Sequence, residues 1–405
     1  MAVNLFEPAV LHPVPGIRLG TAAAGIRKKN RDDLLLIACA EGTTAAAVFT
    51  RNRFCAAPVA VAKRHLAVSS PRALLINSGC ANAGTGRPGE RDALTCCAAV
   101  ADLLPVRARE VLPFSTGVIG MRLPADKIAA ALPDCVAACA EDNWLRAARA
   151  IMTTDTLPKG ATRRVRIGGR TITITGIAKG AGMIRPDMAT LLSFIATDAR
   201  LPRPLLARCL RQAVDQSFNR ITVDGDTSTN DACVLLASGR ADIPALRAGS
   251  REYARFETAV GEVMTDLAQA IIRDAEGATK FVTVEVTGGA TEGDCLKAAY
   301  AVAQSPLVKT ALFASDPNWG RILAAVGRAG VARLPQEKLM LEINGARIVT
   351  RGGVDPRYTE AQGVAAMAPA EIHIRIGLGM GRARAAIWTS DLSHDYVKIN
   401  AEYRT

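Results

Sequence analysis

Histidine is scarce in this chain, and its ten cysteines are scattered. None of the four histidines (His12, His65, His373 and His394) lies near another histidine or near a cluster of cysteines. A zinc site is therefore not expected, and the sequence predicts no metal centre. No two cysteines form a Cys-x-x-Cys pair, so we expect them to be small buried side chains and not disulfides.

Aromatic residues are also few, at 4% of the chain, although the formal net charge is +12. Arginine outnumbers lysine 39 to 11 and is spread over the whole length. Nucleic-acid binding is not expected, because no basic block is interleaved with aromatic residues. A basic surface that attracts acidic metabolites explains the charge more simply.

Long hydrophobic runs are missing as well. No stretch reaches the roughly 18 apolar residues of a membrane helix, and residues 1–16 lack the basic start and apolar run of a signal peptide. We therefore expect a cytoplasmic protein without membrane contact. With 49% hydrophobic and 22% charged residues the chain has a globular composition. Its 405 residues predict two or three domains, or one large α/β body.

The glycine-rich motifs of nucleotide cofactors are absent. Residues 377–382 follow a predicted strand, but Arg382 stands at the third glycine position of a dinucleotide-binding loop. The 23 residues after it are too few for a βαβ unit. A phosphate-binding P-loop motif is missing too. No bound cofactor is expected.

Strands and helices alternate along the chain, which predicts an α/β fold. Short apolar runs indicate strands at 34–37, 45–50, 73–77, 190–196, 232–237 and 281–286. Helical patterns fall at 90–104, 125–152, 202–217 and 256–273. Alternating residues around two glycines predict a hairpin at 164–175. After Gly288 the pattern restarts, so we expect a main body over 1–288 and a smaller α+β domain over 289–405.

The segment from Lys179 to Asp198 places a hydroxyl where a constrained loop enters an apolar strand. A glycine-rich turn and a proline keep its first half irregular, and Thr190 begins the apolar run. A rigid strand would fix the Oγ of Thr190 while the loop leaves one side open, as a nucleophile requires. The alternative is an ordinary loop before a core strand, with Thr190 present for its β propensity.

Threonine needs a base to accept its proton before it can attack a carbonyl, and no histidine is an evident candidate. If the chain is cut between Ala189 and Thr190, the new α-amino group can be that base, because its reference pKa is about 7.7–8.0. Acyl transfer also needs donors for the oxyanion. Thr116 and Gly117, at the end of a predicted strand, offer a hydroxyl and an unhindered N–H, although such a tripeptide is also a common turn.

These features together resemble the ornithine acetyltransferases, the glutamate N-acetyltransferases of arginine biosynthesis. The resemblance runs nearly end to end. It is carried by residues 25–28, 50–53, 77–84, 153–159, 179–184, 188–190, 224–230, 316–320 and 396–405. Leu191 and Cys80 depart from the family pattern, in which methionine and asparagine are more usual, but neither has a catalytic role there.

The resemblance implies a self-processing N-terminal nucleophile enzyme with a layered α/β body joined to a smaller domain. Cleavage between Ala189 and Thr190 would give an α chain, 1–189, and a β chain, which stay intertwined as an α2β2 heterotetramer. Thr190 would take the acetyl group of N2-acetyl-L-ornithine as an ester and pass it to L-glutamate. Thr116 and Gly117 match the oxyanion-hole positions of the family. Its substrate-binding positions, besides Thr190 itself, are matched by Thr153, Lys179, Glu276, Asn400 and Thr405.

The charges fit these implied roles. Lys179 is suited to a substrate carboxylate and Glu276 to the extra ammonium of ornithine. We further expect a strand over 395–399 that carries Asn400 and Thr405 back to the site, against the usual tendency of chain ends to fray.

Three alternatives remain at this point. The family motifs do not tell whether acetyl-CoA is a second acetyl donor. A related self-processing aminopeptidase or amidase would resolve the acyl ester with water instead of glutamate. A basic binding protein would have no catalysis at all, and would neither cleave itself nor form an ester.

Overall fold

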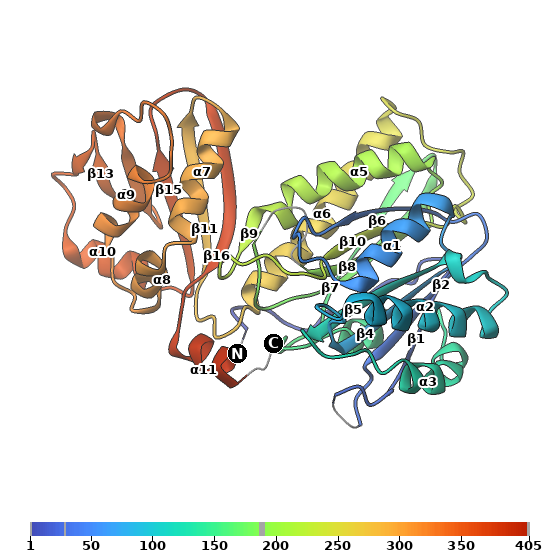
Figure 1. The fold of residues 1–405 in the computed structure, drawn as a ribbon. Helices are drawn as coiled ribbons and strands as arrows, with labels where there is room; N and C mark the ends of the chain where they lie inside the picture. Colours follow the sequence, from blue (N-terminus) through green and yellow to red (C-terminus); the bar gives the residue numbers. More distant parts are fainter. Residues whose placement is uncertain (1, 28–29, 186–190, 403–405) are drawn as a thin grey trace.

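The computed structural model describes residues 2–27, 30–185 and 191–402. The chain forms a large body and a smaller domain that lies to one side of it (Figure 1). Residues 189, 190 and 405, on which several predictions fall, lie outside the described residues.

The body contains two sheets, one of four strands and one of five. The first sheet has the order β1 (Ile17–Ala22), β2 (Leu34–Cys39), β4 (Ala73–Cys80) and β5 (Val111–Val118). The second has the order β3 (Thr44–Phe49), β10 (Ala232–Ala237), β8 (Leu192–Thr197), β7 (Arg170–Lys179) and β6 (Lys159–Ile167). Strand pairs β4–β5 and β8–β10 are parallel, and the other pairs in these sheets are antiparallel.

The two sheets pack face to face, and helices cover their outer faces. Leu74 and Ile76 of β4 point into the core between the sheets, whereas Leu75 points to the outer helices, as the two-residue period of a strand requires. In the shared core the rings of Phe114 and Phe194 meet edge to face at 5.1 Å. The predicted layered α/β body is confirmed.

The helices of the body pack against the two sheets. Helices α2 and α3 pack on the outer face of the first sheet, α5 and α6 cover the second, and α1 lies beside β5. The bounds are α1 (Ala57–Val68), α2 (Gly86–Leu103), α3 (Ala125–Ala137), α4 (Trp144–Ala150), α5 (Arg203–Gln216) and α6 (Arg251–Arg273). Short 3-10 helices are also present in the body, namely η1 (Ala108–Glu110) and η2 (Phe218–Arg220).

The hairpin predicted at 164–175 is present as β6 and β7. Its turn residues Gly168 and Gly169 have φ angles of 57° and 80°. Two consecutive positive φ values are what a tight hairpin turn of the primed type needs.

The smaller domain is built on a third sheet of seven strands. Its order is β14 (Gly353–Val354), β13 (Ala346–Thr350), β12 (Met340–Ile343), β15 (Glu371–Gly377), β11 (Phe281–Gly289), β16 (Ala383–Ser390) and β9 (Ile221–Thr222). Its helical elements are α7 (Glu292–Ala303), α8 (Pro306–Phe313), α9 (Trp319–Gly327), η3 (Gln336–Lys338) and α10 (Glu360–Met367). Strand β11 pairs with β15 and β16 and therefore belongs to this sheet. It begins at Phe281, before the domain boundary expected near residue 288. Strand β9, from the body's part of the sequence, joins the same sheet.

The strand predicted near the end of the chain is wrong. Residues 395–399 are not a strand but part of helix α11 (His394–Glu402). The β-prone residues Tyr396, Val397 and Ile399 suggested a strand, but they follow a helical period. Tyr396 packs against the core of the body, whereas Val397 points outward and is 62% exposed. The helix brings Asn400 one turn from Tyr396, whose carbonyl accepts a hydrogen bond from Nδ2 of Asn400 at 2.9 Å.

Two predictions from composition can be compared with the described residues. All ten cysteines are free, and eight of them are buried, which confirms the expectation of small buried side chains. Within the described ranges no helix combines the length and the apolar character needed to cross a membrane.

Candidate active site

A cavity of about 90 Å³ lies where the edges of the two body sheets meet the C-terminal helix. Its walls come from the ends of β5 and β7, the loops before β10 and after α6, and helix α11. Six of the predicted site residues line it: Thr116, Gly117, Thr153, Lys179, Glu276 and Asn400. Leu191 also borders the cavity; in the sequence it directly follows Thr190. The predicted roles of Ala189, Thr190 and Thr405 fall outside the described residues.

Thr116 and Gly117 are fixed by the parallel pairing of β5 with β4, in which Gly117 lies opposite Gly79. Gly117 has a φ of 134°, and a Cβ there would lie 2.3 Å from the carbonyl carbon of Gly79. Only glycine allows this close approach. The amide of Asn230 binds the carbonyl of the neighbouring Ser115 at 2.9 Å. The strand end that presents these two groups is therefore held on both sides.

Lys179, the last residue of β7, points to Thr116. Its Nζ donates a hydrogen bond to the Oγ1 of Thr116 at 2.9 Å. Burial lowers the pKa of Lys179, while the carboxyl groups of Asp155 and Asp231 partly oppose that shift. The cavity thus holds a lysine that loses its proton more readily than a solvated one.

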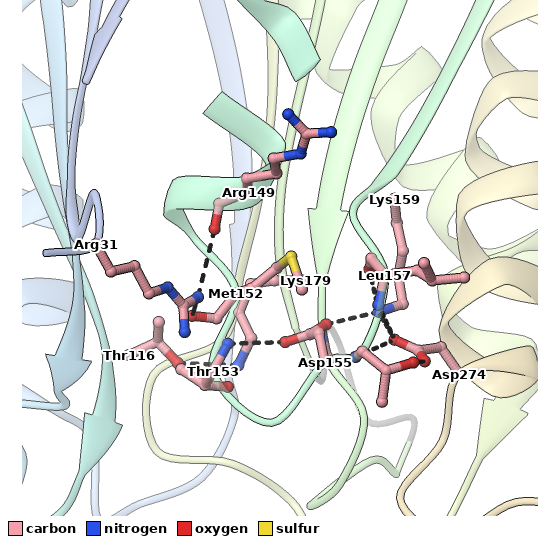
Figure 2. A network of polar contacts seen from close by, with 12 residues as sticks. Arg31, Thr116, Arg149, Met152, Thr153, Asp155, Leu157, Lys159, Lys179 and Asp274 are labelled. Carbon is pink, nitrogen blue, oxygen red and sulfur yellow. Dashed lines mark hydrogen bonds and ion pairs between the residues drawn. The ribbon is translucent and has the colours of Figure 1, made fainter. Parts of the chain in front are cut away.

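Thr153 borders the cavity because the loop after α4 turns back on Asp155 (Figure 2). The carboxylate of Asp155 accepts hydrogen bonds from the backbone N–H of Thr153 at 2.9 Å and of Gly180 at 2.7 Å. It also forms an ion pair with Lys159 at 2.7 Å, and Lys159 in turn binds Asp274 at 2.6 Å. These three ionic side chains are almost fully buried.

Burial opposes the ionisation of Asp155 and of Lys159, but their contacts outweigh it. The pKa of Asp155 is lowered overall, because Lys159, Lys179 and its hydrogen bonds exceed the effect of burial. In the same way the two carboxylates raise the pKa of Lys159 above its usual value. Asp155 and Lys159 are therefore both charged at neutral pH.

The side chains of Glu276 and Asn400 are in contact at the wall of the cavity. The Nδ2 of Asn400 donates to the Oε2 of Glu276 at 2.8 Å. A Cβ on Gly182 would lie 2.3 Å from that same oxygen, so glycine makes room for the carboxylate. Gly277, with a φ of 67°, lets helix α11 approach, because a Cβ there would lie 2.5 Å from the backbone nitrogen of Tyr396.

The sequence reasoning assigned no role to three further acidic residues around the cavity, Asp155, Asp224 and Asp231. Asp224 accepts the backbone N–H groups of Met183 at 2.6 Å and Ile184 at 3.0 Å, and so holds the glycine-rich loop. Asp155 and Asp224 lie within segments that resemble the family, whereas Asp231 directly follows the last residue of such a segment. Acidic residues inside those motifs were the available signal.

Asp231 lines the cavity and is 3% exposed. Burial raises its pKa well above the usual value, although Ser228 and Lys179 oppose the shift. Its Oδ2 has no hydrogen-bond partner in the part of the chain that the structure describes.

The described residues contain no group of three histidine, cysteine, aspartate or glutamate side chains that could hold a metal ion. The polar groups of the cavity are instead a hydroxyl and backbone N–H at a strand end, one ammonium, and carboxyl and amide groups opposite. This is a set that can bind a charged amino acid and stabilise a developing oxyanion.

Comparison with known proteins identifies the family. The ArgJ family profile matches residues 18–405. The chain belongs to the ArgJ family. It is 58% identical over 395 residues to the arginine biosynthesis bifunctional protein ArgJ of Methylococcus capsulatus, with 98% of this chain and 97% of the relative covered. It is 56% identical to the ArgJ protein of the same description from Pseudomonas fluorescens, with both chains covered completely. The protein is therefore an acyltransferase of arginine biosynthesis, as predicted.

Solved ArgJ structures also match. The arginine biosynthesis bifunctional protein ArgJ of Bacillus halodurans is 38% identical with a TM-score of 0.50, over 52% of this chain and 98% of that chain. The ornithine acetyltransferase of Mycobacterium tuberculosis, solved in complex with ornithine, is 39% identical with a TM-score of 0.40, over 44% of this chain and 94% of that chain.

Proposed function

We propose that this ArgJ enzyme transfers the acetyl group of N2-acetyl-L-ornithine to L-glutamate through an acetyl ester on Thr190. The observation that carries the proposal is one cavity that combines Thr116, Lys179 and Glu276 and is bordered by Leu191, the residue after Thr190. Membership of the ArgJ family supports it.

The chemistry is a double displacement. The Oγ of Thr190 attacks the acetyl carbonyl, the C–N bond breaks, and the amine of ornithine leaves with the proton that the hydroxyl has lost. The amine of glutamate then attacks the ester, and the Oγ of Thr190 leaves and regains a proton. Each attack puts negative charge on the acetyl oxygen, which the hydroxyl of Thr116 and the N–H of Gly117 would bind.

Self-cleavage between Ala189 and Thr190 would create the α-amino base. The Oγ of Thr190 attacks the carbonyl of Ala189 and the C–N bond breaks, which frees the α-amino group of Thr190 and leaves an ester. Water then hydrolyses that ester to the carboxylate of Ala189 and the free hydroxyl of Thr190. The solved chain from Bacillus halodurans supports a cut, because it matches 52% of this chain with 98% of its own length. A chain that starts at Thr190 would span a similar share of the sequence.

The other cavity residues would bind the amino-acid parts of the substrates. Lys179 is placed for a carboxylate and Glu276 for the side-chain ammonium of ornithine. Thr153 and Asn400 add a hydroxyl and an amide within the same cavity. Thr405 would complete the set from the end of the chain.

The assembly and the second donor belong to the same proposal. The two chains, 1–189 and 190–405, would remain together as an α2β2 heterotetramer in the cytoplasm. Acetyl-CoA would be a second acetyl donor, since the relatives of more than half identical sequence are described as bifunctional. No bound cofactor is needed for either reaction.

Mass spectrometry and kinetics test the proposal. The purified protein should consist of two fragments of 189 and 216 residues (405 − 189 = 216), whereas Thr190→Ala should stay uncut and inactive. Double-reciprocal plots for N-acetylornithine and glutamate should be parallel. An uncut, fully active wild type would contradict the nucleophile, and acetate release at the same rate without glutamate would indicate a hydrolase. Acetylation of glutamate by acetyl-CoA measures the second activity directly.

A further inference from the structure

The carboxylate of Asp155 holds two walls of the cavity at once. Its Oδ2 accepts the backbone N–H of Thr153 at 2.9 Å, and its Oδ1 accepts that of Gly180 at 2.7 Å. Thr153 borders the cavity itself, and Gly180 directly follows Lys179. One side chain therefore sets the positions of Thr153 and of Gly180, which lies 25 residues after Asp155 in the sequence.

Among the buried side chains around Asp155, negative charges outnumber positive ones unless Lys179 is counted. The side chains of Asp155 and Lys159 are fully buried, and that of Asp274 is 1% exposed. Two carboxylates thus share the single ammonium of Lys159, and this excess of negative charge lies beside the ammonium of Lys179 (Figure 2). In a medium of low dielectric such an excess favours a proton on the nearby lysine.

Lys179 is faced by charged groups from four elements. Asp155 comes from the loop after α4, Asp231 from the segment before β10 and Glu276 from the loop after α6, and all three raise its pKa. Lys159, at the start of β6, lowers it. Burial is the largest influence and lowers the pKa, so the protonated state depends on these neighbours.

The protonation state of Lys179 matters because of its contact with Thr116. A protonated Nζ can only donate, so the hydroxyl oxygen of Thr116 accepts from it at 2.9 Å and the hydroxyl proton remains available. A neutral Nζ has a lone pair and can accept that proton instead. The hydroxyl would then point away from the substrate.

We propose that Asp155 is a positioning residue for acetyl transfer, which fixes the backbone at Thr153 and Gly180 and keeps the proton on Lys179. Thr116 is thereby left free to donate its own proton to the acetyl oxygen. This role rests on the proposed function, because it concerns the same oxyanion site.

Asp274 provides a matched control. It is as buried as Asp155, carries the same charge and binds the same Lys159 at 2.6 Å. Its remaining described partners are Thr156 and Leu157, which do not line the cavity. Loss of either carboxylate weakens the buried cluster, but only Asp155 has direct contacts with the walls of the cavity.

The test is the pH dependence of kcat/KM for N-acetylornithine in the wild type, Asp155→Asn and Asp274→Asn. This parameter reports the first half-reaction, so titration of the amine of glutamate does not enter it. Activity should fall as the pH rises through the pKa of Lys179. Asp155→Asn should shift that fall to lower pH by about one unit or more and reduce kcat/KM at neutral pH by about tenfold or more. Asp274→Asn also removes one charge of the excess, but Asp155, and not Asp274, is among the groups that shift the pKa of Lys179, so this variant should move the fall by less than Asp155→Asn does.

Equal shifts in the two variants, or no shift in Asp155→Asn, would overturn the role of Asp155. If Asp155→Asn does not fold, Asp155→Glu decides the question, because it keeps the charge but displaces the carboxylate. We expect it to keep the pH of the fall and to lower kcat/KM, and wild-type kinetics in this variant would overturn the proposal. A wild-type enzyme without acetyl transfer would overturn the proposed function and this role together, whereas an unshifted profile overturns this role alone.

Discussion

The ammonium of Lys179 lies 2.9 Å from the hydroxyl oxygen of Thr116, although the two residues are 63 positions apart in the sequence. The lysine comes from the end of β7 in one body sheet and the threonine from the end of β5 in the other. Their contact joins the two sheets at the rim of the cavity. It also fills an acceptor position of Thr116 with a charged donor, which makes the hydroxyl a better donor toward a developing oxyanion.

Thr116→Val should lower kcat by about 10²–10³-fold, because it removes one donor to the oxyanion while keeping the shape of the side chain. KM for N-acetylornithine should change much less, since the interaction develops mainly in the transition state. Thr116→Ser keeps the hydroxyl and serves as the control. Steady-state acetyl transfer measures both variants, and equal activity of the valine and serine variants would contradict the oxyanion role.

Lys179→Arg should remove the alkaline loss of activity. Burial lowers the pKa of Lys179, so the wild-type ammonium is present at low pH and is lost as the pH rises through the lowered value. Arginine stays protonated throughout this range, and the residual activity of the variant should remain level there. Profiles of kcat/KM for N-acetylornithine between neutral and alkaline pH test this, and an unchanged alkaline fall would assign it to another group.

Asn400→Ala should raise KM for both substrates, because Asn400 lines the cavity and binds Glu276 at 2.8 Å. Val397→Ala is the matched control on the same helix, since Val397 is 62% exposed and points away from the body. Deletion of residues 400–405 should have a larger effect on KM. Self-cleavage should continue in all three proteins, because it needs only Thr190 and its neighbourhood. Wild-type KM values in the truncated enzyme would remove the chain end from the site.

Asp274→Asn should lower the free energy of unfolding by about 3 kcal/mol, because it removes one carboxylate from a buried ion-pair cluster. Arg170→Ala breaks an ion pair whose side chains are 64% and 88% exposed, and should change stability by less than about 1 kcal/mol. Denaturant unfolding compares the two. Similar losses would show that the buried cluster contributes no more than a surface pair.

The sequence by itself determined the local elements and the chemistry of several site residues. Paired glycines at Gly168 and Gly169 predicted a hairpin turn, because few other residues adopt two consecutive positive φ values. The strand end at Gly117 and the glycine-rich loop after Lys179 were also visible as short-range patterns. The family resemblance then named six residues that the structure brings to one cavity.

Only the tertiary structure decided which charges are buried together and how the chain end folds. Lys159 is charged in the core because Asp155, four residues before it, and Asp274, 115 residues after it, both bind its ammonium. Residues 395–399 form a helix because one face, with Tyr396, packs against the body, and this contact overrides their preference for a strand. Short-range patterns reflect local backbone preferences, whereas the stability of a buried ion or an amphipathic face depends on partners that only the complete fold supplies.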